Sequence, residues 1–298
     1  MAKSAVASLT FAAFLTMWVS GFNQGQTKQS SPQSEGVPVD TQWTLDAAGG
    51  VQRNAIQSVL LLVCTKTNMK GTGFLISGGK IVTAAHVVTG CEARDVRGTT
   101  PLNHAVEFSV PIVRDERLDL AVLIPTVALQ GGLELGTDTN IPLGKAVTTW
   151  GFPLIYNGPA PLLSVGYVSG YYGAQIEGQT FKHMVVNGAF NPGNSGGPVL
   201  VAGDNKIVGV VIWKSIAFSG QVQEAIKGFH NARLATGGTF SERQPDGSYK
   251  GITDQEVIAR VLEEFYEKVQ VDIGEAVSVS ELRKFLKSHE REFAPSTN

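Results

Sequence analysis

The sequence predicts an all-β body, because two features of residues 51–219 are typical of closely spaced strands. The first is a series of short apolar segments that are rich in valine, isoleucine, leucine and threonine. The second is the turn residues between them, which contribute to a total of 34 glycines and 13 prolines among 298 residues. Strands that follow one another so closely favour a barrel or a sandwich over alternating strands and helices. The predicted strands include Ser58–Cys64, Gly73–Ser77, Lys80–Ala84, Leu120–Ile124, Ala146–Trp150, His183–Val186, Pro198–Val201 and Ile207–Trp213.

The first 21 residues have the pattern of a secretory signal peptide. Lys3 precedes an apolar stretch from Ala5 to Val19, and the small residues Ser20 and Gly21 follow it. The stretch is shorter than the roughly 20 apolar residues that a membrane-spanning helix needs. We therefore expect residues 1–21 to be a signal peptide and the chain to be exported, either periplasmic or secreted. The alternative is that the segment remains uncleaved as an N-terminal membrane anchor. If it is cleaved, we expect no membrane span in the mature chain.

Two segments of different character flank the β body. Residues 22–50 are polar and rich in proline, glycine, serine and glutamine, which predicts a flexible linker. Residues 219–298 change to a helical period, which predicts a helical C-terminal extension. We expect three helices there: one capped by Ser219, one that starts with the capping box Thr253–Glu256, and one over Glu281–Phe293 capped by Ser280.

The charge and cysteine content narrow the function classes. The formal net charge is −2 and no long basic run is present, which argues against a nucleic-acid partner. The two cysteines, Cys64 and Cys91, would enter an oxidising compartment, so we expect one disulfide between them, with two free thiols as the alternative. No further Cys/His pair has the spacing of a zinc site, and the sequence implies neither a metal nor another cofactor.

The motif NPGNSGGP at residues 191–198 surrounds one hydroxyl, that of Ser195, with small residues. Acyl transfer needs a nucleophile that a carbonyl group can approach, and N–H groups directed at the oxygen that becomes negative. Glycine permits both the tight backbone and the close approach. We therefore predict Ser195 as the nucleophile and an oxyanion hole over Gly193, Asn194 and Ser195, with the N–H groups of Gly193 and Ser195 as donors. A simple turn between two strands is the alternative.

His86 ends the β-like run IVTAAHVV at residues 81–88, where its neighbours are apolar or small. A neutral imidazole can accept the serine proton and return it to the leaving amine, because its pKa lies near neutral pH. We predict His86 as the general base, against the alternative of a half-buried structural histidine. The other histidines lack a comparable setting and are interpreted as structural: His104, His183, His230 and His289.

Asp119 is a single carboxylate at the entrance of the apolar run RLDLAVLI, residues 117–124. Burial of a carboxylate is costly unless it is hydrogen-bonded. The ring N–H of His86 would supply that bond and would fix the tautomer of the imidazole. The alternatives are an Asp at a strand edge that faces water, or one that pairs with Arg114 or Arg117.

The order His, Asp, Ser is that of the chymotrypsin-like triad. The segments GTGFLIS, IVTAAHVV, LDLAVL and NPGNSGGPV resemble the HtrA/Deg-type and related bacterial trypsin-like serine proteases. WGFP at 150–153 and SVGYVSG at 164–170 resemble the start of that family's second barrel. The resemblance implies an all-β core of two six-stranded antiparallel barrels of the chymotrypsin fold. The protease domain would span residues 51–218, with the first barrel at about 51–130, the second at about 140–218 and the triad between them. It also implies a serine endopeptidase that cleaves polypeptides through an acyl-enzyme.

Two departures limit what the resemblance carries over. Digestive trypsins have Asp before the serine, where this chain has Asn194, and no Ile-Val-Gly-Gly-like start is visible, so activation by a new N-terminus is not expected. HtrA proteases usually carry PDZ domains after the protease body, and residues 219–298 contain no recognisable carboxylate-binding loop.

By analogy with the family, the first specificity pocket is lined by residues before the serine and on the strand after it: Ala189, Phe190, Val211, Ile212 and Trp213. No acidic residue stands at its base, so we expect a preference for a small or medium apolar side chain over Arg or Lys.

Two other functions compete with this interpretation. Gly193 to Gly197 also satisfies G-x-S-x-G, the motif of α/β-hydrolases, but Pro198 and a predicted strand follow the serine where that motif requires a helix. A catalytically inactive, protease-shaped binding or scaffold protein is the second alternative. Such relatives usually lose a triad member, whereas this chain has a residue for each role.

Overall fold

The computed structural model describes residues 38–139, 141–154, 156–188, 190–214, 239–243, 248–253, 256–262 and 273–293. Within these residues, no helix combines the length and the hydropathy required to cross a membrane. The predicted signal peptide and the helix predicted to start at Ser219 lie outside the described residues.

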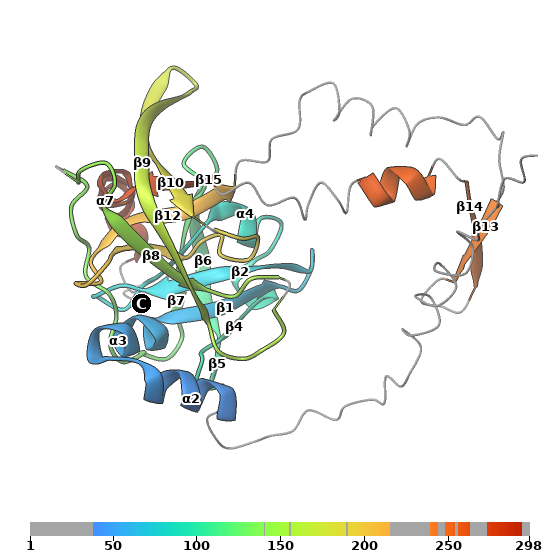
Figure 1. The fold of residues 1–298 in the computed structure, drawn as a ribbon, viewed down its shortest axis with the longest axis horizontal. Helices are drawn as coiled ribbons and strands as arrows, with labels where there is room; N and C mark the ends of the chain where they lie inside the picture. The colour runs from blue at the N-terminus through green and yellow to red at the C-terminus, as the bar shows by residue number, and fades with distance from the viewer. Residues whose placement is uncertain are drawn as a thin grey trace, which may run out of the picture. The chain divides into compact units, whose positions relative to one another are not determined.

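Two antiparallel β-sheets form the body that the sequence predicts (Figure 1). The first sheet has seven strands in the order β5-β4-β1-β2-β3-β7-β6. The bounds of its strands are β1 Val59–Cys64, β2 Met69–Leu75, β3 Ile81–Thr83, β4 Val96–Thr99, β5 Ala105–Val106, β6 Phe108–Asp115 and β7 Leu120–Pro125. The second sheet is a closed barrel of six strands in the order β10-β15-β12-β11-β8-β9. Its strands are β8 Ala146–Gly151, β9 Leu162–Ile176, β10 Gln179–Gly188, β11 Pro198–Val201, β12 Ile207–Lys214 and β15 Ile273–Ser278.

The mostly β architecture with two barrel-like sheets is therefore confirmed, with one difference in the first sheet. That sheet has seven strands where six were expected, because the two-residue strand β5 adds to the edge of β4.

The last strand of the second barrel, β15, corrects the prediction of a purely helical extension over residues 219–298. β15 pairs with β10 on one side and with β12 on the other, so the second barrel does not end at residue 218. Without it, β10 and β12 would both be open edges. The strand is only six residues long and its partners are distant in the sequence, so the local pattern did not reveal it.

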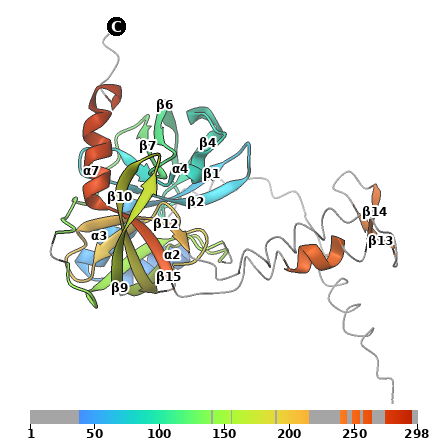
Figure 2. The same ribbon diagram turned by 90° about the horizontal axis from the view of Figure 1, so that it is seen from above.

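The helix α7, Val279–Ser288, follows β15 directly and contacts the second barrel (Figure 2). It begins two residues before the predicted start, and a short 3₁₀ helix, Glu290–Phe293, continues it. Ser280 does not cap this helix, because it lies inside it and its hydroxyl donates to Asp138 Oδ2 at 3.0 Å.

The capping box predicted at Thr253 is present. The N–H of Thr253 donates to Glu256 Oε2 at 2.8 Å, the N–H of Glu256 donates to Thr253 Oγ1 at 3.2 Å, and residues 256–262 are helical. A hairpin of β13, Thr239–Arg243, and β14, Tyr249–Thr253, precedes this helix, which is a second correction to the helical extension.

The linker predicted for residues 22–50 is wrong over its last part. Residues Val39–Ala47 form α2 and residues Gly50–Ser58 form α3, which leads into β1. The apolar residues of α2 do not share one face, since Val39 and Trp43 are exposed while Leu45 packs into the main core, so its sequence has no clear helical period. Tertiary packing outweighs the weak local signal here.

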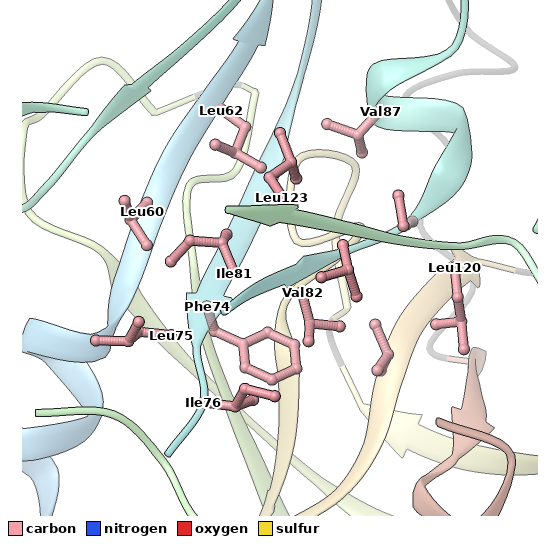
Figure 3. Packing of buried hydrophobic residues seen from close by; sticks show 14 of the residues in the cluster. Leu60, Leu62, Phe74, Leu75, Ile76, Ile81, Val82, Val87, Leu120 and Leu123 are labelled. Atoms are coloured by element: carbon pink, nitrogen blue, oxygen red, sulfur yellow. The ribbon is translucent and has the colours of Figure 1, made fainter. Parts of the chain in front are cut away.

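The core of the first sheet also anchors a short helix, α4, Ala85–Val88. Val87 is fully buried and lies in the cluster with Leu62 of β1 and Leu123 of β7 (Figure 3). Because α4 has only four residues, this burial rather than helix propensity holds it in place. The position of His86, the neighbour of Val87, follows from that packing.

The expected disulfide is present between Cys64, at the end of β1, and Cys91, in the segment after α4. It ties the segment that carries His86 to the first sheet.

Removal of this bridge should destabilise the fold. The double variant Cys64→Ser/Cys91→Ser should have a free energy of unfolding about 3 kcal/mol lower than the parent, because the bridge closes a loop with a sequence separation of 27 residues. Denaturant unfolding with and without dithiothreitol measures this. Dithiothreitol should weaken the parent and leave the double variant unchanged; a parent that is insensitive to dithiothreitol would contradict the prediction.

Candidate active site

Asp119 holds both the ring and the main chain of His86. Its Oδ2 lies 2.7 Å from His86 Nδ1, and its Oδ1 accepts the N–H of His86 at 2.9 Å. Its carbonyl oxygen also accepts the N–H of Ala85 at 3.1 Å. Because a carboxylate only accepts, Nδ1 must carry the hydrogen, which leaves the lone pair of Nε2 available to accept a proton.

The local backbone explains why an aspartate fits this position. Asp119 adopts a positive φ of 51° at the turn before β7, a conformation that Asp and Asn tolerate better than most residues. The alternative partners are occupied elsewhere. Arg117 pairs with Asp115 at 3.0 Å, and Arg114 donates to the carbonyl oxygens of Val88 and Cys91.

Ser195 lies in a loop whose peptide groups bond to both sheets. Its carbonyl oxygen accepts the N–H of Thr72 of β2 at 2.9 Å, and the next N–H, that of Gly196, donates to Val211 O of β12 at 2.6 Å. Gly193 has a φ of 98°, and a Cβ there would collide with the carbonyl oxygen of Phe152. The loop therefore requires glycine at 193.

β2 brings the histidine helix and the serine loop together. A Cβ at Gly71 would lie 3.0 Å from the carbonyl oxygen of Ser195 and 2.8 Å from a methyl group of Val87. Since Val87 follows His86, the structure brings the predicted histidine, aspartate and serine to the same part of the molecule, although they are up to 109 residues apart (195 − 86).

The N–H groups of the predicted oxyanion hole differ in whether they already have a hydrogen-bond partner. Within the described chain, the N–H groups of Gly193 and Ser195 have no hydrogen-bond partner, so both can donate to a ligand. The N–H of Asn194 donates to Asn191 O at 2.9 Å and is not available. Asn194, which was predicted as part of the hole, therefore supplies no free N–H, in keeping with the choice of Gly193 and Ser195 as the expected donors. Its fully buried side chain bonds instead to Ser164 Oγ at 3.4 Å.

The predicted specificity pocket is only partly described. Phe190, Val211 and Ile212 are all buried, and Trp213 belongs to β12, whereas Ala189 lies outside the described residues. Gly274 of β15 was not among the predicted residues, yet the ring of Phe190 packs on it so closely that a Cβ would lie 2.6 Å from Phe190 Cδ2. Gly274 lies opposite Val186 of β10 and Lys214 of β12, and such long-range pairings leave no local signal in the sequence.

A second cluster of ionisable groups lies on the second barrel. His183 Nδ1 is 3.1 Å from the hydroxyl of Tyr172, which donates to Glu275 Oε2 at 2.6 Å. Burial, with the nearby Glu275 carboxylate, raises the pKa of Tyr172 well above its usual range. Burial lowers the pKa of His183, although the charges of Glu275, Glu281 and Asp119 oppose that shift. His183 is thus a buried structural histidine, as expected.

The trypsin-like peptidase domain family matches residues 71–210 of the chain. The chain is 32% identical over 157 residues to Protease Do-like 4, mitochondrial, of Arabidopsis thaliana, an alignment that covers 48% of this chain and 27% of that protein. It is 30% identical over 149 residues to a probable periplasmic serine endoprotease, DegP-like, of Chlamydia pneumoniae, covering 49% of this chain and 29% of that protein. The chain thus spans less than a third of the length of these curated relatives.

Solved structures share the fold at lower identity. The active form of the Rv3671c protease from M. tuberculosis has a TM-score of 0.54 and 17% identity, with coverage of 80% of this chain and 83% of that one. The HtrA-type protease AlgW with a tripeptide also has a TM-score of 0.54, with 18% identity and coverage of 80% of this chain and 62% of that one.

The lowered pKa of His183 predicts a loss of stability in mild acid. In the unfolded chain His183 takes up a proton near its ordinary pKa of about 6.5, whereas the buried native ring does so only at lower pH, so the free energy of unfolding falls as the pH decreases through this interval. His183→Phe should remove this contribution, which is at most about 1.4 kcal/mol per pH unit.

Denaturant unfolding at pH 7 and pH 5 measures the difference. The exposed His104 offers a matched control, since His104→Phe should keep the pH dependence of the parent. Equal pH dependence in the parent and in His183→Phe would contradict the prediction.

Proposed function

We propose that the chain is a serine endopeptidase that acts through Ser195, His86 and Asp119. The match of residues 71–210 to the trypsin-like peptidase domain family, the similarity to a DegP-like endoprotease and the shared fold with an HtrA-type protease support this proposal. The observation that carries the proposal is the pair of hydrogen bonds that Asp119 accepts from the main-chain N–H and the ring of His86, at 2.9 and 2.7 Å. This pair leaves Nε2 free as a base, on a helix that packs against the same β2 segment as the serine loop.

In the proposed mechanism, Ser195 Oγ attacks the carbonyl carbon of the scissile peptide bond while His86 Nε2 accepts the hydroxyl proton. The N–H groups of Gly193 and Ser195 stabilise the negative oxygen of the tetrahedral intermediate. His86 then returns the proton to the leaving amine, and the acyl group remains on Ser195. A water molecule, deprotonated by His86, attacks this ester, and the bond to Ser195 Oγ breaks as His86 returns the proton to that oxygen, which releases the carboxylic acid product and restores the serine. Asp119 stabilises the imidazolium formed in each step.

The buried ring of Phe190 supports a proposal for the substrate. The ring of Phe190 packs on Gly274 of β15 and shares a buried cluster with Val211, another residue of the predicted pocket, and from this we infer that Phe190 limits the depth of that pocket. A shallow apolar pocket accepts a small side chain better than a large one. We therefore propose polypeptides with a small apolar residue before the cleaved bond as substrates.

The export of the chain is also a proposal. The Chlamydia relative is named as periplasmic, and the bridge between Cys64 and Cys91 fits an oxidising compartment. Residues 1–21 would supply the signal peptide. The alternative of an inactive scaffold protein has no observation in its favour, since each triad position holds the required residue.

Labelling with a fluorophosphonate, together with hydrolysis of a peptide library, tests the function. The parent should be labelled and should cleave peptides, and Ser195→Ala should abolish labelling and lower turnover by about a millionfold. Asp119→Asn tolerates the same backbone and should lower turnover by about 10⁴ because it favours the wrong tautomer of His86. A folded parent with no Ser195-dependent labelling or cleavage would establish the scaffold alternative.

The proposed pocket predicts a change of specificity. Phe190→Ala should favour substrates with Leu or Phe before the cleaved bond over substrates with Ala there. The ratio of the two kcat/KM values should rise by at least about tenfold, because each substrate methylene that the enlarged pocket accommodates raises kcat/KM by roughly 10-fold or more. Phe181→Ala is the matched control, since Phe181 is a buried ring of the same barrel but belongs to another core cluster. A preference that stays constant in Phe190→Ala, or changes equally in Phe181→Ala, would refute the assignment of the pocket.

A further inference from the structure

Thr72 of β2 is a fully buried residue that bonds to the serine loop through both its main chain and its side chain. Its N–H donates to the carbonyl oxygen of Ser195 at 2.9 Å. Its hydroxyl donates to the carbonyl oxygen of Gly193 at 2.7 Å, across a sequence separation of 121 residues. Few other side chains could fill the same buried space and donate the same hydrogen bond to the serine loop.

The direction of the hydroxyl bond is determined by its partners. The N–H of Phe152, just after β8, donates to Thr72 Oγ1 at 3.1 Å. Because an N–H can only donate and a carbonyl oxygen can only accept, the hydroxyl hydrogen of Thr72 must point at Gly193 O. The hydroxyl thus links the serine loop to the main chain of the second barrel.

These bonds fix two peptide groups on either side of Ser195. The 193–194 peptide is held at its carbonyl by the hydroxyl of Thr72 and at its N–H by Asn191 O, at 2.9 Å. The 195–196 peptide is held at its carbonyl by the N–H of Thr72 and at its N–H by Val211 O. The two oxyanion donors, the N–H groups of Gly193 and Ser195, belong to the peptide groups adjacent to these fixed ones.

The bond from the Thr72 hydroxyl matters because the residue that it holds, Gly193, is a glycine. Glycine has access to many more backbone conformations than other residues, so the peptide groups on both sides of Gly193 can rotate unless something holds them. On the 193–194 side, the hydroxyl of Thr72 holds the carbonyl oxygen.

We propose that Thr72 is a positioning residue for the oxyanion hole: its hydroxyl fixes the 193–194 peptide so that the N–H of Gly193 stays directed at the developing negative charge. This assignment rests on the proposed function. Thr72 touches neither substrate nor reacting atoms, and it acts through Gly193. A preorganised hole needs no rearrangement during the reaction, which is the source of its effect on the rate.

The test compares Thr72→Val, which has nearly the same shape and no hydroxyl, with Thr72→Ser, which retains the hydroxyl. Thr72→Val should lower kcat by about tenfold to a hundredfold, less than the complete loss of an oxyanion donor, with KM little changed. The affinity for a peptide aldehyde, whose oxygen occupies the hole after addition to the serine, should fall by the same factor. Thr72→Ser should recover most of both.

The matched control is Thr83→Val. The Thr83 hydroxyl is also fully buried and donates to the carbonyl oxygen of Thr72 at 2.8 Å, so its loss costs a comparable hydrogen bond without releasing Gly193 O. Thr83→Val should retain the kcat of the parent. Circular dichroism and denaturant unfolding establish the folded fraction of each variant, and Thr72→Ala replaces Thr72→Val if the latter does not fold.

Each outcome decides the proposal. If the parent is active, three results would refute the role of Thr72 and leave the proposed function intact. These are an unchanged kcat in Thr72→Val, a loss in Thr72→Ser or Thr83→Val as large as that in Thr72→Val, and a change in KM without a change in kcat. A folded parent without Ser195-dependent turnover would refute the proposed function, and the role of Thr72 with it.

Discussion

The two residues Gly71 and Thr72 of β2 form the contact on which the site depends. The histidine helix reaches this contact through Val87, which packs against Gly71, and the serine loop reaches it through the bonds from Thr72 to Ser195 and Gly193. Because β2 is a central strand of the first sheet, its position is set by its neighbours β1 and β3. The packing of this sheet therefore sets the relative positions of the proposed base and nucleophile. A hydrogen bond between their two side chains is not required to hold them in place.

The second constraint is the closure of the second barrel. β12, the second strand after the serine loop, would be an edge strand without β15, which comes from a segment 59 residues later in the chain (273 − 214). This strand supplies Gly274, and the absence of a side chain there lets the ring of Phe190 pack against the strand. The position of a residue that we propose to line the pocket thus depends on a residue outside the stretch that carries the recognisable motifs.

The sequence predicted the parts of the site that are local. Ser195 and His86 stand in motifs of small residues that are recognisable over eight positions, and the isolated carboxylate of Asp119 was identified by its unusual place before an apolar strand. The role of Thr72 could not be predicted, because its hydroxyl bond spans 121 residues and threonine is common in strands. The strand β15 and the helix α2 were missed for a related reason, since the pairing and packing that stabilise them come from distant parts of the chain. The capping box of Thr253 and Glu256, which involves only neighbouring residues, was predicted correctly.

In the proposed reaction Ser195 carries the acyl group during turnover, with His86 held by Asp119 as its base. Acid quenching of the chain during hydrolysis of an activated ester, followed by mass spectrometry of its peptides, detects this intermediate directly. We expect an acyl group on Ser195, in the peptide that contains residues 191–198. An acyl group on a different residue, or turnover with no acylated peptide under conditions that trap such esters, would contradict it.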